Sequence, residues 1–98
     1  MVKKIIKFSA SWCAPCRVYA PTFHEVSKME QFNDIEFEEH DVEESDEVEE
    51  MVGKFKIQGV PSTVLLNENG EMIKKLSGNI PLGQLVDLIN ETIRNEEK

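Results

Sequence analysis

Residues 9–17 read Ser9-Ala10-Ser11-Trp12-Cys13-Ala14-Pro15-Cys16-Arg17. They follow a short segment, residues 2–8, that is rich in Ile, Val and Phe and is interrupted by Lys. An apolar segment of this length that ends at small polar residues is typical of a buried strand leading into a loop. The sequence therefore places two cysteines, Cys13 and Cys16, directly after a strand.

A helix is predicted to begin at Cys13 and to continue to about Met29. Apolar side chains recur at spacings of three or four, as in a helix with one buried face. These side chains are Val18, Tyr19, Phe23 and Val26. We expect Pro21 to kink this helix or to end its first section, because its ring cannot donate a backbone hydrogen bond and clashes with the preceding turn.

The next strand and helix follow in residues 35–55. Residues 35–42 begin with an alternation of apolar and charged side chains, which predicts a second strand. Ser45 is a suitable cap for a helix behind it. The apolar positions of that helix are Val48, Met51, Val52 and Phe55.

The last part of the chain predicts a hairpin and a helix. Residues 62–66 and 71–77 flank an Asn69-Gly70 pair, whose positive-φ positions suit a hairpin turn between antiparallel strands. Pro81 suits the first turn of a final helix. Its apolar positions are Leu82, Leu85, Val86, Ile89 and Ile93, and residues 95–98 are expected to fray.

The predicted order is β-α-β-α-β-β-α, in one domain over residues 1–98. A helix between the first two strands makes them parallel through a right-handed crossover. The hairpin adds two more strands, so the sequence predicts an α/β fold with a mixed four-stranded sheet and helices on both faces.

Charge and hydropathy exclude several classes of function. The formal net charge is −8, which argues against binding to nucleic acid or to an anionic membrane surface. Residues 29–50 hold twelve acidic and no basic residues, which we interpret as a solvated face, with a docking surface for a basic partner or a loose cation site as alternatives. No apolar run approaches the roughly 20 residues of a membrane span, and no secretory signal is visible, so we expect a cytoplasmic protein.

The cysteine spacing is the first evidence for choosing among packing, metal binding and redox chemistry. At the start of a helix, Cys13 and Cys16 lie one turn apart on the same face, close enough to form a disulfide. The positive end of the helix dipole stabilises a thiolate at Cys13 and lowers its pKa below about 8.5. Cys13 is then the attacking sulfur, and Cys16 resolves the mixed disulfide that Cys13 forms.

A zinc site is the main alternative for this pair, with His24 and His40 as the other ligands. His24 lies eight residues after Cys16 on the predicted helix, about 12 Å along the axis, whereas a zinc bond measures about 2 Å. We therefore expect no metal site within one chain. A metal ion shared between two chains is the remaining alternative that involves a metal. His24 is expected to be exposed, and a role for His40 near the site stays open.

The sequence resembles the thioredoxin family, and the match spans almost the whole chain. The segments that carry the resemblance are residues 9–17, Ala20-Pro21, Gly59-Val60-Pro61-Ser62-Thr63, Gly70-Glu71 and Gly78. The Trp-Cys-x-Pro-Cys element and a second proline that opens the third strand are highly specific. The resemblance implies the minimal thioredoxin fold, because the larger members carry an extra strand and helix before this point.

The resemblance also implies a role for each matching residue. The active-site motif is matched by Trp12, Cys13, Ala14, Pro15 and Cys16, with Trp12 beside the disulfide, Cys13 as nucleophile and Cys16 as resolving thiol. Pro61 matches a proline that is cis in the family and faces the disulfide. Val60 would offer its backbone to an extended substrate segment, and Gly78 would line the same groove.

One departure is chemical, because Lys7 stands where the family has a buried Asp that is thought to relay protons to the resolving thiol. If Lys7 is buried and charged, it should favour the thiolate and make the protein a stronger oxidant. If it is neutral, it could accept the proton itself. A third alternative is that it reaches water or pairs with a carboxylate such as Glu39, which leaves the potential unchanged.

These observations predict a thiol-disulfide oxidoreductase that reduces protein disulfides and needs no bound cofactor or metal beyond the Cys13–Cys16 pair. The family suggests an NADPH-dependent flavoprotein thioredoxin reductase as electron donor, with glutathione or a dedicated partner as alternatives, and a monomer is the simplest expectation. The alternatives are an oxidase or isomerase, and a non-catalytic binding subunit that uses the surface of Trp12, Val60 and Gly78.

Overall fold

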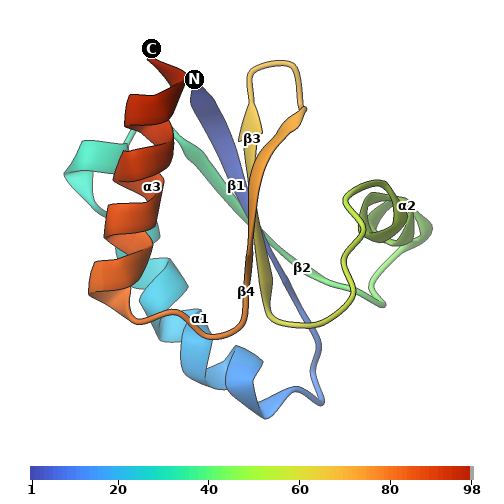
Figure 1. Ribbon diagram of the computed structural model, residues 1–98. Coiled ribbons are helices and arrows are strands. Elements are labelled where there is room, and N and C mark those ends of the chain that lie inside the picture. Colours follow the sequence, from blue (N-terminus) through green and yellow to red (C-terminus); the bar gives the residue numbers. More distant parts are fainter. Residues whose placement is uncertain (98) are drawn as a thin grey trace.

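A computed structural model describes residues 1–97, and its elements follow the predicted order (Figure 1). The strands are β1 (Val2–Ser9), β2 (Glu36–Asp41), β3 (Ser62–Asn67) and β4 (Met72–Ser77). The helices are α1 (Ala14–Ser27), α2 (Asp46–Lys54) and α3 (Leu82–Glu96), with a 3-10 turn, η1 (Glu30–Phe32), before β2. No helix within residues 1–97 is long and apolar enough to cross a membrane.

The four strands form one mixed sheet in the order β2-β1-β3-β4. β1 is parallel to β2 and β3 is antiparallel to β4, both as predicted, and β1 is also antiparallel to β3. α1 and α3 cover one face of the sheet, and α2 lies on the opposite face (Figure 1). The expected fold class is therefore confirmed, with β1 and β3 as the central strands.

Two apolar clusters hold the layers together, one on each face of the sheet. The cluster beneath α1 and α3 includes Ile5, Tyr19, Phe23, Leu65 and Ile89. The cluster beneath α2 includes Ile6, Phe8, Val48, Phe55 and Val64. Successive residues of β1 and β3 point to opposite faces, so the runs Ile5-Ile6 and Val64-Leu65 contribute to both clusters.

One of the two alternatives for Pro21 is excluded, and one expectation for α1 is wrong. The helix does not end at Pro21 but continues to Ser27. Pro21 is exposed, so water can replace the backbone hydrogen bond that its ring removes. Val18 does not belong to the buried stripe, because it is 62% exposed while its neighbour Tyr19 is fully buried.

The cap of α2 and the β3–β4 turn show how local polar groups define these elements. Ser45 caps α2 as predicted, and its Oγ accepts a hydrogen bond from the Val48 amide at 3.2 Å. In the turn only Gly70 has a positive φ, at 78°, whereas a positive φ was expected at Asn69 too. The Asn67 side-chain oxygen accepts hydrogen bonds from the Asn69 and Glu71 amides and so closes the turn.

The final helix differs from the prediction at both ends. Pro81 is the cap residue that precedes α3, not a residue of its first turn. Asn95 and Glu96 are helical, so the expected fraying is wrong for these two residues. Lys98, the last residue of the predicted tail and of the predicted domain, lies outside the described residues.

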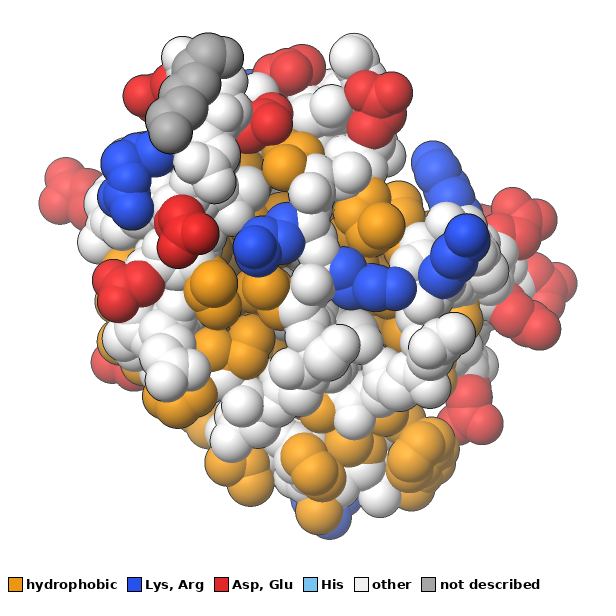
Figure 2. Space-filling model, viewed as in Figure 1, with side chains coloured by type: hydrophobic (Ala, Val, Ile, Leu, Met, Phe, Trp, Pro, Cys, Tyr) orange, Lys and Arg blue, Asp and Glu red, His pale blue; other side chains and the backbone are white. Residues whose placement is uncertain are grey.

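The part of the acidic segment that forms α2 lies at the surface on one side of the molecule. Figure 2 shows acidic side chains projecting around α2, at the right of the view. In the first turn of α2, Asp46, Glu47 and Glu49 are favourably placed against the positive end of the helix dipole. All three are exposed, which agrees with the interpretation of a solvated face.

Candidate active site

The two cysteines lie where β1 gives way to α1. Cys13 is the cap residue of α1, and Cys16 is the third residue of the helix. Pro15 is tolerated in this first turn because backbone N–H groups there have no partner within the helix. The two residues form a disulfide with a Cα–Cα distance of 5.3 Å, and both side chains are almost completely buried. The predicted bridging geometry is confirmed.

The backbone around the disulfide favours negative charge on Cys13. Its Sγ accepts a hydrogen bond from the Cys16 amide at 3.2 Å. The first turn of α1 contains no acidic side chain that would oppose the positive end of the helix dipole. When the disulfide is reduced, these groups stabilise a thiolate at Cys13.

A second chain segment packs against the disulfide. The Val60–Pro61 peptide bond is cis, and the Val60 carbonyl oxygen lies 3.6 Å from Cys13 Sγ. The Gly78 amide donates a hydrogen bond to the Pro61 carbonyl at 2.8 Å. Gly78 has a φ of 83°, a conformation that favours glycine. The structure thus brings Val60, Pro61 and Gly78 together.

An apolar groove opens beside these residues. It has a volume of about 390 Å³, and Trp12 at its edge is 67% exposed. The lining residues are Trp12, Val42, Val52, Ile57, Gln58, Gly59 and Val60. The sequence analysis assigned Val52 to the buried face of α2 and missed this lining. The short connection from Ile57 to Val60 was the signal that could have placed Ile57 near the site.

Lys7, on β1, is buried, with 3% of its side chain exposed. Its Nζ lies 2.7 Å from Glu39 Oε1 and 5.5 Å from the centre of the Phe23 ring. Lys7 and Cys16 line a common cleft of about 180 Å³. The structure combines features of two of the three alternatives, because Lys7 is buried, as in the first, and is paired with Glu39, as in the third.

Glu39 connects Lys7 to the protein surface. Its second oxygen, Oε2, contacts His24 Nε2 on α1. Partial burial raises the pKa of Glu39, but the hydrogen bonds and positive charges of Lys7 and His24 outweigh this effect and leave the pKa below its usual value. His24 is exposed, as predicted, but its contact with Glu39 was missed.

The other histidine belongs to a separate polar network. His40 lies between two glutamates. Its Nε2 is 3.0 Å from Glu38 Oε1, and its Nδ1 is 3.3 Å from Glu44 Oε2. Its ring also lies 6.3 Å from that of Phe8. Within residues 1–97 no group of three or more His, Cys, Asp or Glu side chains is arranged to hold a metal ion.

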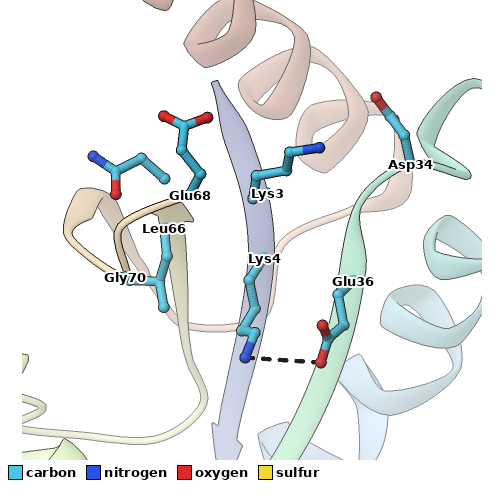
Figure 3. Close-up of a pocket in the computed structure, with 8 residues that line it drawn as sticks. Lys3, Lys4, Asp34, Glu36, Leu66, Glu68 and Gly70 are labelled. Atoms are coloured by element: carbon cyan, nitrogen blue, oxygen red, sulfur yellow. Dashed lines mark ion pairs between the residues drawn. The ribbon is translucent and has the colours of Figure 1, made fainter.

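A larger cavity than the groove lies away from the cysteines, at the other end of β1. It has a volume of about 460 Å³ and opens between the β3–β4 turn and the start of β2. Several charged residues line it. Figure 3 shows Lys4 paired with Glu36, and Lys4 Nζ lies 3.7 Å from Glu36 Oε2. Lys4 also contacts Glu38 at 2.9 Å. Because no cysteine lines it, we assign it no part in the sulfur chemistry.

A sheet flanked by helices, with a disulfide at the start of the first helix opposite a cis-proline, defines the class of thioredoxin-like redox proteins. The thioredoxin family model matches residues 2–91. The chain therefore belongs to the thioredoxin family, and Cys13 and Cys16 form the disulfide of its Trp-Cys-x-Pro-Cys motif.

Individual relatives and solved structures agree with this assignment. The chain is 39% identical to thioredoxin H5 of Oryza sativa subsp. japonica over 75 residues, which cover 76% of this chain and about half, 52%, of that protein. It is 32% identical to thioredoxin of Mycoplasmoides gallisepticum over 87 residues, with 89% of this chain and 81% of that protein covered. The structure of Malassezia sympodialis thioredoxin matches with a TM-score of 0.78 and 26% identity over 91% of this chain and 73% of that one.

Proposed function

We propose that the protein reduces disulfide bonds in other proteins, with Cys13 as the nucleophile and Cys16 as the resolving thiol. The position of Cys13 carries this proposal: it caps α1, its sulfur accepts a backbone hydrogen bond, and it faces the Val60–Pro61 segment. Cys13 and Cys16 are similarly buried, at 5% and 3% exposure, so this division of roles rests on the cap position of Cys13 and its hydrogen bond and not on a difference in access.

The reaction takes place in two exchange steps. The Cys13 thiolate attacks one sulfur of the substrate disulfide, forms a mixed disulfide and releases the other substrate sulfur as a thiolate. Cys16 then loses its proton and attacks Cys13, which forms the Cys13–Cys16 disulfide and releases the second substrate sulfur. Two electrons pass from the cysteine pair to the substrate, and no bound cofactor is required.

Neighbouring residues support this chemistry in the proposal. Ala14 and Pro15 keep the turn between the cysteines short, and Pro61 packs beside the disulfide. An extended substrate segment binds along the backbone of Val60, with Trp12 on one side and Gly78 on the other. The apolar groove beside Trp12 would receive an apolar side chain next to the substrate cysteine, which supports this binding mode.

The oxidised pair must be reduced again after each cycle. We assign this step to an NADPH-dependent flavoprotein thioredoxin reductase, the donor that membership of the family suggests. The cytoplasm is the proposed compartment, because its thiol pools keep such a pair reduced. A monomer is proposed because the groove at Trp12 must stay open to protein substrates.

Catalysed reduction of a protein disulfide tests the proposal directly. With dithiothreitol as electron donor and insulin as substrate, we expect the protein to accelerate cleavage of the insulin disulfides at catalytic concentrations. The Cys13→Ser variant should show only the uncatalysed rate. Binding of the substrate protein without any acceleration would instead indicate a non-catalytic binding subunit.

A further inference from the structure

The Lys7–Glu39 ion pair forms a connection from the disulfide to the surface that the exchange steps do not require. The Lys7 side chain is only 3% exposed, whereas that of Glu39 is 39% exposed. Glu39 uses one oxygen for Lys7 and the other for His24. The carboxylate therefore stands between a buried cation and a surface imidazole.

Each element packed around Lys7 contributes a group that faces it. β2 contributes Glu39 and Asp41, α1 contributes Cys16, Arg17 and the Phe23 ring, and β3 contributes Thr63 as the paired residue. Among these, Glu39 makes the ion pair with Lys7. Glu39 is thus the group that balances the buried positive charge at short range.

The net charge of this pair acts on the sulfur chemistry, because Lys7 and Cys16 line the same cleft. Reduction of the disulfide transfers two electrons to the sulfurs and leaves at least one of them as a thiolate at neutral pH when the pKa of Cys13 is lowered. A positive charge in a poorly solvated site favours that thiolate and therefore the reduced form, whereas a negative charge disfavours it. When Lys7 and Glu39 are paired, their charges cancel, and the pair exerts little net electrostatic effect on the sulfurs.

We propose that Glu39 is a positioning residue that sets the reduction potential of the Cys13–Cys16 pair by holding and neutralising Lys7, an inference that rests on the redox function proposed above. His24 fixes the free oxygen of Glu39 and so keeps the carboxylate turned toward the lysine. Because Glu39 neutralises its charge, Lys7 can share a cleft with Cys16 in a protein that acts as a reductant.

Charge variants of the pair test the inference through the equilibrium with dithiothreitol. Glu39→Gln leaves one positive charge, and we expect it to shift the equilibrium toward the reduced protein by about tenfold, or about 30 mV. Lys7→Met leaves one negative charge and should shift it toward the oxidised protein. The double variant is again neutral and should lie within about twofold of the wild type.

Glu36→Gln is the matched control. Glu36 lies on the same strand as Glu39, but its carboxylate pairs with Lys4 and not with Lys7. This substitution should leave the equilibrium unchanged. A Glu39→Gln protein that behaves like this control, or that shifts in the same direction as Lys7→Met, overturns the inference. If Glu39→Gln does not fold, Lys7→Met and the double variant decide, since the first must shift and the second must not. A wild type without a reversible transition would refute the proposed function instead.

Discussion

The Cys16→Ser variant is expected to accumulate as a mixed disulfide with its substrate proteins through Cys13. Without the second thiol, the covalent intermediate can be resolved only by a thiol from solution. An attacking group held in place within one molecule corresponds to an effective concentration of about 10⁵ M or more, so its loss should lower turnover at least a hundredfold. The mixed disulfides are measured on non-reducing gels, on which they disappear after treatment with dithiothreitol.

The Cys13→Ser variant provides the matched control for this trap. It keeps Cys16, which lacks the cap position and the backbone hydrogen bond that favour a thiolate at Cys13, and should therefore form no mixed disulfide with the same proteins. Equal trapping by both variants would show that either sulfur can attack, and the proposed division of roles would be wrong. Full turnover by Cys16→Ser would show that Cys16 does not resolve the intermediate.

The Leu65→Ala variant is expected to lose about 2–5 kcal/mol of unfolding free energy. Leu65 is completely buried on the central strand β3, where it pairs with Ile5 of β1 and Lys74 of β4. Truncation leaves a cavity beneath α1 and α3 that this packed layer can fill only in part. Because domains of this size have a total stability of about 5–15 kcal/mol, the loss is large, and urea unfolding measures it.

Val18→Ala is the control for this prediction. It also shortens an aliphatic side chain, but Val18 is 62% exposed on α1. We expect a change within about 0.5 kcal/mol, as for most surface substitutions. A loss at Val18 comparable to that at Leu65 would contradict the arrangement of α1 described here.

The sequence predicted the order of elements because each one carries its own local signal. The apolar spacing of Tyr19, Phe23 and Val26 identified α1, and the serine at position 45 identified the start of α2. The same local signals gave the wrong result at Val18. This residue fits the helical pattern but is exposed, because burial depends on how α1 packs on the sheet, which no local pattern records.

The candidate site was predictable where neighbouring residues form it and less so where distant residues meet. The cysteine pair was placed correctly because its two members are one helical turn apart. The contact between Glu39 and His24 and the apolar lining of the groove depend on how β2, α1 and α2 pack together. Lys7 itself left three alternatives open, and only the register between β1 and β2, which places Lys7 opposite Glu39, selects the paired form.

The central claim is that Cys13 and Cys16 form a reversible two-electron couple poised for reduction of proteins. The equilibrium reduction potential tests it most directly, measured from Trp12 fluorescence and free-thiol counts in dithiothreitol and glutathione buffers, with Cys13→Ser as the control. Because Glu39 neutralises Lys7, we predict a reversible transition near about −270 mV, the range of reducing thioredoxins. A transition displaced toward about −120 mV would indicate an oxidase or isomerase, and the absence of a reversible transition would contradict the redox function altogether.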